Sequence, residues 1–320
     1  MQSPDILTEV KMKLFDLHCD TVYRAFTEKS TLFNDSYHIS LNKTKEITPY
    51  IQCFAAWIPD EYRGEAAQAL FRGCAEALKK QLQGTGAVIC RTASQLEQVR
   101  SSGGIGAILT VEGGAVLAGR LENIEMLRRE GVKMMTLTWN GANELGDGVG
   151  VENAGGLTPF GRLAVAEMEK NDIIIDVSHA SEKLFYEVAE CTRKPFAASH
   201  SDSKRLCPHK RNLTDEQFGI IRERNGLVGL NFCVDFLNKT ATNAKMYDII
   251  RHAEHFLSLG GEKCLAIGGD FDGADIPDDV SGIEAMPRLY EMFLHHNFSE
   301  ALVNDIFFDN AFRFFQGTMA

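Results

Sequence analysis

The chain has 320 residues, of which 44% are hydrophobic and 24% are charged, as in globular proteins with a large buried core. Its formal net charge of −11 and its pI near 5.3 argue against nucleic acid or an anionic membrane as a partner, because like charges repel. No apolar stretch of the sequence reaches the roughly 18 residues of a membrane-spanning helix.

The N-terminus lacks the basic and apolar regions of a signal peptide. We therefore expect residues 1–11 to be a flexible extension before a single catalytic domain of residues 12–320. The eight cysteines include no C-x-x-C pair and mostly lie in apolar or helical segments, which favours free buried thiols in a reducing compartment. These features predict a cytoplasmic protein that binds neither nucleic acid nor membrane.

Strand-like and helical segments alternate along the chain. The first half is expected to contain strands at residues 15–20, 50–58, 87–91, 105–111 and 133–138, with helices at 65–83, 94–100 and 121–130. The second half is expected to contain strands at 173–177, 196–199, 227–232 and 264–267, with helices at 158–171, 181–191, 215–224, 246–259 and a mainly helical tail at 284–315. Between the halves, residues 140–156 form a polar, glycine-rich segment that is too long for a simple connection and is typical of a functional loop.

Repeated strand–helix units favour a (β/α)8 TIM barrel over a doubly wound parallel sheet. The sequence also has no G-x-G-x-x-G or G-x-x-x-x-G-K motif, which counts against a nucleotide-binding sheet. A barrel of this kind carries its active site at the C-terminal ends of its strands.

Metal-binding residue types follow five of the predicted strands. They are His18 and Asp20, then Glu112, His179, His200 and Asp270. Each has a structural explanation when taken alone, such as a turn cap or a hydrogen-bonded histidine at a strand end. Because parallel strands point the same way, however, residues at their downstream ends converge on one face. One shared site explains all of these positions together. By contrast, His252, His255, His295 and His296 lie in polar helical segments and are predicted to be surface residues.

Imidazole and carboxylate ligands with little thiol suit zinc, and less specifically manganese, iron or cobalt. Three histidines and two or three carboxylates exceed the three protein ligands of one catalytic zinc, which indicates two metals that share a bridging carboxylate. Two adjacent metals can hold a hydroxide between them and polarise the carbonyl that it attacks. Hydrolysis of an amide or ester is the natural reaction for such a site.

Together these residues resemble the membrane dipeptidase (renal dipeptidase) family over about residues 14–315. The motifs that carry the resemblance in the first half are Asp16-Leu-His18-Cys-Asp20-Thr21, His38-Ile-Ser-Leu41, Gln52-Cys-Phe-Ala-Ala-Trp57, Val111-Glu112-Gly-Gly114 and Leu137-Thr-Trp-Asn140. Those in the second half are Asp176-Val-Ser-His179, Ser199-His200-Ser201, Lys210-Arg-Asn212 and Gly268-Gly-Asp270-Phe-Asp272-Gly273. Their order and spacing agree with the family as well.

The resemblance implies a barrel of the amidohydrolase type with a two-zinc centre. His18 and Asp20 would bind one zinc, His179 and His200 would bind the other, and Glu112 would bridge the two. The reaction implied is the attack of a metal-bridging hydroxide on the peptide carbonyl.

The resemblance also implies how a substrate is held. Arg211 would bind the C-terminal carboxylate of a dipeptide, a task suited to its planar pair of donors. Asp270 would bind the amino group and serve in proton transfer to the leaving nitrogen. Family members cleave dipeptides, often with a D-residue in second position, and usually form homodimers, so a homodimer is expected here.

One position departs from the family pattern. Many members carry a histidine after Leu-Thr that contacts the substrate and the developing oxyanion, whereas this chain has Trp139. Indole has one donor and no titratable nitrogen, and loss of one oxyanion donor costs roughly a hundred- to a thousandfold in rate. Asn140, Asn143 or His209 could compensate, or Trp139 could reshape the pocket. Trp139 and Asn140 are therefore candidate substrate-binding residues.

The leading hypothesis is a cytoplasmic zinc dipeptidase in which Glu112 and Asp270 are catalytic. A second reading keeps the metals but changes the bond, as in a lactonase, a cyclic-imide hydrolase, a deaminase or an N-acyl amino acid hydrolase. A third is a metal-holding binding protein whose catalysis has decayed at Trp139. Arg211 favours a substrate with a carboxylate, and the full ligand set counts against the third reading.

Overall fold

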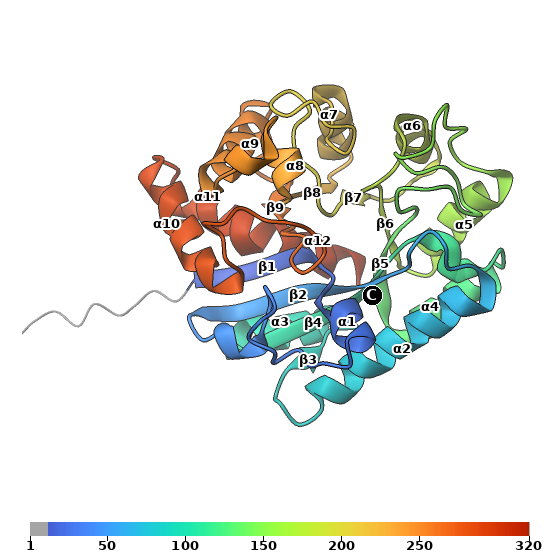
Figure 1. The fold of residues 1–320 in the computed structure, drawn as a ribbon, viewed down its shortest axis with the longest axis horizontal. Coiled ribbons are helices and arrows are strands. Elements are labelled where there is room, and N and C mark those ends of the chain that lie inside the picture. The colour runs from blue at the N-terminus through green and yellow to red at the C-terminus, as the bar shows by residue number, and fades with distance from the viewer. Residues whose placement is uncertain (1–11, 320) are drawn as a thin grey trace, which may run out of the picture.

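The computed structural model describes residues 12–319, so residue 320 and residues 1–11, where the sequence predicts a flexible extension, lie outside the described residues. Within them, eight parallel strands form a closed TIM barrel, as predicted (Figure 1). In ring order these are β1 (Met12–Cys19), β2 (Ile47–Trp57), β4 (Ile105–Glu112), β5 (Val132–Thr136), β6 (Ile174–Asp176), β7 (Ala197–Ala198), β8 (Leu227–Leu230) and β9 (Leu265–Ile267), which pairs with β1. The short strand β3 (Val88–Ile89) pairs with the beginning of β4 only.

Helices surround the barrel (Figure 1). They are α1 (Thr21–Thr27), α2 (Gly64–Leu82), α3 (Ala93–Ser102), α4 (Glu122–Glu130), α5 (Pro159–Lys170), α6 (Glu182–Cys191), α7 (Asp215–Glu223), α8 (Val234–Leu237), α9 (Met246–Ser258), α10 (Met286–His295), α11 (Glu300–Asn304) and α12 (Asn310–Thr318). Several begin at a residue whose side chain accepts an N–H of the first turn, namely Thr92, Thr158, Ser181 and Thr214. None of the helices in residues 12–319 has the length and apolarity needed to cross a membrane.

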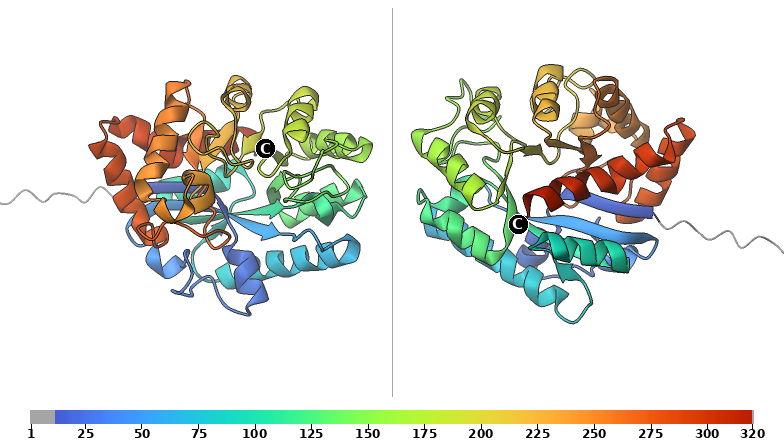
Figure 2. Two further views of the ribbon diagram at one scale, coloured as in Figure 1. Left: turned by 45° about the horizontal axis from the view of Figure 1, so that its top comes forward. Right: turned by 180° about the vertical axis from the view of Figure 1, so that it is seen from behind.

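The inside of the barrel is filled at its N-terminal end. Each of the eight barrel strands contributes to one buried cluster, which also includes aromatic residues of the C-terminal segment: Phe15, Leu17, Ile51, Cys53, Ile108, Met134, Ile174, Ala197, Leu227, Ala266, Phe308, Phe312 and Phe315. The view from behind shows α12 running across this part of the barrel (Figure 2). Because the N-terminal end is packed, only the C-terminal ends of the strands leave room for a site.

The glycine-rich loop at residues 140–156 folds back onto the end of the barrel. The N–H of Val149 donates to the carbonyl of His179 at 2.8 Å, and the N–H of Gly150 donates to that of Asn140 at 2.7 Å. A Cβ atom at Gly148 would collide with the backbone of Trp139 and Asn140, so only glycine allows this approach. The loop therefore supports residues that the sequence places in the site.

One histidine prediction is wrong. His252 of α9 is buried, with Nε2 lying 3.0 Å from the carbonyl of Leu237 and Nδ1 accepting the N–H of Ser203 at 3.0 Å. Leu237 ends helix α8 and Ser203 lies 49 positions before His252 in the chain, so the polarity of α9 alone could not reveal these partners.

Candidate metal centre

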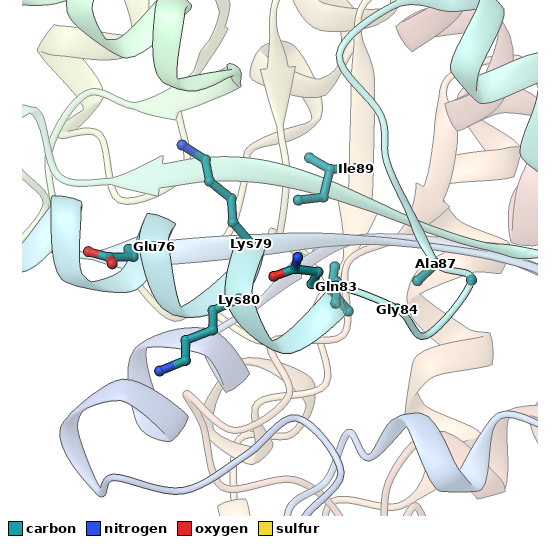
Figure 3. A pocket seen from close by; sticks show the side chains of 9 residues that line it. Glu76, Lys79, Lys80, Gln83, Gly84, Ala87 and Ile89 are labelled. Atoms are coloured by element: carbon teal, nitrogen blue, oxygen red, sulfur yellow. The ribbon is translucent and has the colours of Figure 1, made fainter.

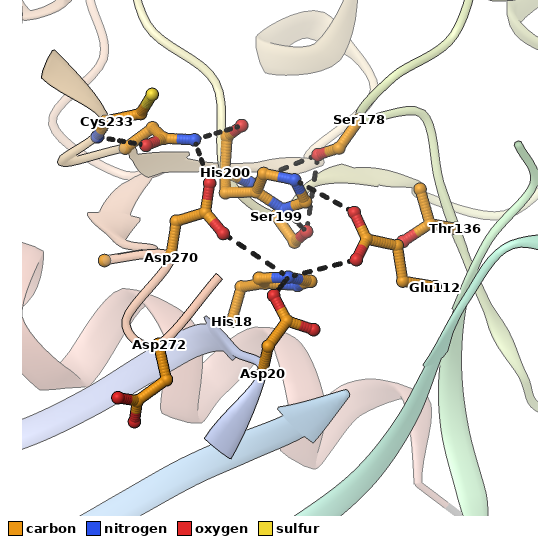
Figure 4. A network of polar contacts seen from close by, with 12 residues as sticks. His18, Asp20, Glu112, Thr136, Ser178, Ser199, His200, Cys233, Asp270 and Asp272 are labelled. Carbon is orange, nitrogen blue, oxygen red and sulfur yellow. Dashed lines mark hydrogen bonds and ion pairs between the residues drawn. The ribbon is translucent and has the colours of Figure 1, made fainter. Parts of the chain in front are cut away.

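The predicted ligands converge at the C-terminal ends of the strands (Figure 4). The six histidines and carboxylates that the sequence places at the strand ends are all buried: His18, Asp20, Glu112, His179, His200 and Asp270. Buried ionisable groups are costly unless they are paired or bind metal, so six of them in one place indicate a functional centre.

Glu112 lies between two groups of histidines. Its Oε2 atom is 3.6 Å from Nε2 of His18, whereas its Oε1 atom is 2.9 Å from Nε2 of His179 and 3.6 Å from Nε2 of His200. The two oxygens of one carboxylate thus face different imidazoles.

On the other side of His18 lie two more carboxylates. Nε2 of His18 is 3.5 Å from Oδ2 of Asp20 and 3.8 Å from Oδ1 of Asp270. Two triads have ligand atoms that all lie within 4.8 Å of one another, as a single ion requires: His18 with Glu112 and His200, and His18 with Asp20 and Asp270. Nε2 of His18 and Oδ1 of Asp20 also have no hydrogen-bond partner among the described residues.

Hydrogen bonds fix the tautomers of the other two histidines. The hydroxyl of Ser199 donates to Oδ2 of Asp176 at 2.6 Å, so Nδ1 of His200, at 2.7 Å from that hydroxyl, must be its N–H donor. Likewise, Nδ1 of His179 donates to Oδ1 of Asn140 at 3.0 Å.

Both histidines therefore present a bare lone pair at Nε2, and these two nitrogens lie only 3.0 Å apart. Two acceptor nitrogens cannot hydrogen-bond each other, and their lone pairs repel. A cation between or beside them would remove this repulsion. Together with the unpaired atoms of His18 and Asp20, this shows that the residues present fit a divalent metal.

Burial and charge divide the histidines into two kinds. Burial lowers the pKa values of His179 and His200 well below the usual range, and the cationic neighbours Arg211 and His18 add to the effect. Burial also lowers the pKa of His18, but neighbouring carboxylates, Glu112 foremost, outweigh it and hold that pKa well above the usual range. Burial raises the pKa of Glu112 itself to about 7. His179 and His200 are thus kept neutral, which is the form that binds metal.

The backbone is strained at three residues of the centre. His179, Asp270 and Asp272 have φ values of 64°, 57° and 65°, in the left-handed region that residues other than glycine seldom adopt. Asp272 has a fully buried side chain that accepts the hydroxyl of Thr21 at 2.6 Å and the N–H of His38 at 2.8 Å. It therefore anchors the loops around the centre, and such strain is typical of functional sites.

Four supporting residues were not among the sequence candidates. Asp16 accepts the N–H groups of His18 and Gly269, and Asp176 accepts those of Ser178 and Ser199. Each carboxylate thus joins the residue two positions ahead to the segment that follows a neighbouring strand of the ring, β9 for Asp16 and β7 for Asp176. The others, Ser199 and Asn231, contact His200 and Asp270 through their side chains. The repeated pattern of aspartate two or three residues before histidine, in Asp16-Leu-His18 and Asp176-Val-Ser-His179, was the available signal.

We expect replacement of Ser199 by alanine to weaken metal affinity roughly ten- to a hundredfold, because His200 loses the hydroxyl that orients its ring. Calorimetric titration of the metal-free protein with zinc measures this effect directly. Ser203 is buried as well, and its hydrogen bonds join it to His252 and Arg205, so Ser203→Ala is the control. Equal zinc affinity of Ser199→Ala and the parent protein would contradict the orienting role.

The centre opens into a cavity of about 580 Å³. Trp139, Asn140 and Asp270 line it, together with Asp20, Glu112 and His179. Arg211 does not line this cavity and borders a separate hollow of about 30 Å³ instead. Its buried guanidinium lies 5.3 Å from the ring of Phe236, which does line the cavity, and Nη2 donates to the carbonyl of His200 at 3.3 Å. Nε of Arg211 has no acceptor among the described residues.

A larger hollow of about 990 Å³ lies on the surface where α2 ends beside β3 (Figure 3). The side chains around it include Glu76, Lys79, Lys80 and Gln83, and Lys79 is paired with Glu130. No histidine and only one carboxylate are among its lining residues, so it has no group of converging ligands. The cavity of about 580 Å³ beside the metal centre is therefore the one with the chemistry of an active site.

A (β/α)8 barrel with buried histidines and carboxylates at the C-terminal ends of its strands is the architecture of a metal-dependent hydrolase. Comparison with known proteins specifies the class. The sequence model of a family described as membrane dipeptidase (Peptidase family M19) matches residues 5–319. The chain belongs to this family, whose members are metallo-dipeptidases, and it is a hydrolase of that kind.

Individual relatives agree with this assignment. An uncharacterized protein in the pqqA 5' region of Klebsiella pneumoniae is 30% identical over 234 residues, which are 70% of this chain and 86% of that protein. Dipeptidase aclJ of Aspergillus oryzae is 31% identical over 203 residues, which are 62% of this chain but only 48% of that protein.

Solved structures are similar over nearly the whole length. A metallopeptidase of family M19 called dipeptidase AC has a TM-score of 0.90 and 26% identity, with 97% of this chain and 99% of that chain covered. A metallopeptidase from Rhodobacter sphaeroides, liganded with a phosphinate mimic of the dipeptide L-Ala-D-Ala, has a TM-score of 0.89 and 26% identity, with 96% and 99% covered. The amidohydrolase-type barrel that the sequence predicts is thus confirmed.

Proposed function

We propose that this chain is a binuclear zinc dipeptidase that hydrolyses small dipeptides. His18 and Asp20 would hold one zinc ion, His179 and His200 would hold the other, and both ions would share Glu112. The position of Glu112 carries the proposal, because its two carboxylate oxygens face His18 on one side and His179 and His200 on the other. When bound, the two ions would polarise the scissile carbonyl and lower the pKa of the attacking water.

The protein's own residues orient the substrate. Arg211 binds the C-terminal carboxylate of the dipeptide, and the buried guanidinium with its unpaired Nε supports this role. Asp270 binds the amino group, accepts the proton that the attacking water releases, and passes it to the leaving nitrogen. The amide of Asn231 donates to Oδ2 of Asp270 at 3.0 Å, which leaves Oδ1 directed towards His18. Asp270 is thereby held in one orientation for both tasks.

Substrates of the form L-Xaa-D-Xaa are part of the proposal. The Rhodobacter sphaeroides relative was solved with a mimic of L-Ala-D-Ala, and its fold agrees with that of this chain almost throughout. The proposed metal ligands are all present, and Trp139 is not one of them, although its ring centroid lies 6.2 Å from that of His179. We therefore place the difference from the family in substrate choice rather than in metal binding.

We expect metal removal to abolish hydrolysis of L-L and L-D dipeptides, and addition of about two equivalents of zinc to restore it. The measurement is release of free amino acids by untreated, chelator-treated and zinc-restored protein. Absence of cleavage by protein with two bound metals would retire the dipeptidase proposal. Lactones, cyclic imides and N-acyl amino acids would then be assayed, and binding without turnover of any of them would favour a decayed enzyme.

We also propose a cytoplasmic location and a homodimer. All eight cysteines are free thiols, as a reducing compartment maintains. Cell fractionation tests the location, and sedimentation at several protein concentrations tests the dimer. Recovery of the protein outside the cell, or a monomer at every concentration, would contradict the respective proposal.

A further inference from the structure

Three aromatic side chains form a continuous part of the cavity lining. Tyr23, Trp57 and Trp139 all line the cavity and are partly buried. The rings of Tyr23 and Trp57 meet edge to face with centroids 4.8 Å apart, and those of Trp57 and Trp139 do so at 4.9 Å. We call these three residues the aromatic wall.

The aromatic wall borders the metal centre. Trp57 is the last residue of β2 and lies opposite Glu112 in the register with β4, and Trp139 follows β5. Tyr23 lies in α1, directly after Asp20 and the end of β1. The wall therefore occupies the arc of the barrel mouth from β1 through β2 to β5, within reach of a peptide bound at the centre.

Carboxylates are concentrated on the other arc of the mouth, whereas on the side of the wall the charged residues Arg24 of α1 and Glu28, at the end of that helix, pair with each other. Lining residues from the ends of β8 and β9 include Asp235, Asp270, Asp272 and Asp275, with Phe236 next to Arg211. Under the proposed function the amino group of a dipeptide has its partner there, in Asp270, and Arg211 lies beside Phe236 of the same lining. The three rings, by contrast, offer apolar area and no ionised group. A hydrophobic substrate side chain gains most by burying its surface against such rings.

We propose that the aromatic wall binds the side chain of the first residue of the dipeptide and selects large apolar side chains at that position. This inference rests on the proposed dipeptidase function. Asp270, assigned to the amino group, lies beside His18 and so next to β1, which leads into Tyr23. Arg211, assigned to the carboxylate, lies beside Phe236, after β8. The amino-terminal residue is thus the one that faces the wall.

Intrinsic fluorescence tests this without turnover. The chain has only two tryptophans, Trp57 and Trp139, and both belong to the wall. We expect a phosphinate dipeptide analogue with a benzyl group as its first side chain to change tryptophan emission of the zinc-loaded protein. It should bind roughly tenfold more tightly than the analogue with a methyl group there. Equal affinities of the two analogues would overturn the proposal.

Selectivity in turnover provides the second test. For the unmodified enzyme we expect a higher kcat/KM for Phe-Ala than for Ala-Ala, and we expect Tyr23→Ala and Trp139→His to reduce that ratio roughly tenfold. Trp139→Phe, which keeps an apolar ring, should largely preserve it. Tyr247 is an exposed aromatic residue of α9, and Tyr247→Ala should leave the ratio unchanged.

The outcomes separate this inference from the function on which it rests. Cleavage of dipeptides with no preference at the first residue, or with a preference at the second residue only, would overturn the aromatic wall and leave the dipeptidase standing. An equal loss of kcat/KM for Phe-Ala and Ala-Ala in the variants of the aromatic wall would also overturn the proposal, because a merely structural role predicts that result. No cleavage of any dipeptide by zinc-loaded protein would instead remove the dipeptidase function.

Discussion

Replacement of Glu112 by glutamine is expected to lower kcat/KM for dipeptides by about a thousandfold, because two adjacent ions contribute several kcal/mol to catalysis. The variant should also bind fewer metal ions per chain than the parent protein. Glutamine has nearly the same shape, but its neutral amide cannot place a negatively charged oxygen towards both histidine groups. In the structure, Oε2 of Glu112 faces His18 and Oε1 faces His179.

Metal content by elemental analysis and initial rates with a dipeptide measure the two effects on the same sample. Glu130 is a suitable control, because it pairs with Lys79 at the surface where α4 ends. Glu130→Gln should keep both metals and the parental rate. Two tightly bound metals and unchanged turnover in Glu112→Gln would show that Glu112 is not the bridging ligand.

Replacement of Asp270 by asparagine is expected to lower kcat roughly a hundred- to ten-thousandfold, the range for loss of a proton-transferring group. Asparagine can still accept the hydrogen bond from Asn231, so the side chain should stay in place. It has no carboxylate to bind the amino group or to pass a proton. Metal content should remain near that of the parent protein, because all five proposed metal ligands are unchanged.

Steady-state kinetics with a dipeptide and with its N-acetylated form distinguish the two tasks of Asp270. A variant that has lost amino-group binding should no longer discriminate between these two compounds. Asp235 is an exposed carboxylate on the lining of the same cavity, and Asp235→Asn serves as the control. If Asp235→Asn and Asp270→Asn lose activity to the same degree, the loss would reflect a general electrostatic effect of cavity carboxylates. The specific role of Asp270 would then be contradicted.

Several hydrogen bonds of the metal centre could not be predicted, because their partners are far apart in the sequence. The tautomer of His200 depends on Ser199 and Asp176, and Asp176 lies on a different strand. The orientation of Asp270 depends on Asn231, from β8. Asp176 and Ser199 are 23 positions apart, and Asn231 and Asp270 are 39 positions apart, so no local pattern joins the members of either pair. The burial of His252 was mispredicted for the same reason.

Short elements were missed because they have too few residues to show a period. Helices α1 and α8 have seven and four residues, respectively. Their consequences for the site are large, since α1 carries Tyr23 into the cavity lining and α8 carries Phe236 beside Arg211. Trp57 could be placed at the cavity from its strand alone, but its contacts with Tyr23 and Trp139 could not.

The sequence by itself determined the alternation of strands and helices, and with it the barrel and the placement of histidines and carboxylates at the ends of its strands. It could do so because these properties follow from local periodicity and from the common direction of parallel strands. Only the tertiary structure decided which oxygen of Glu112 faces which histidine, how His179 and His200 are protonated, and which rings form the aromatic wall. Those features depend on distances of a few ångströms between residues from different strands, which closure of the barrel alone establishes.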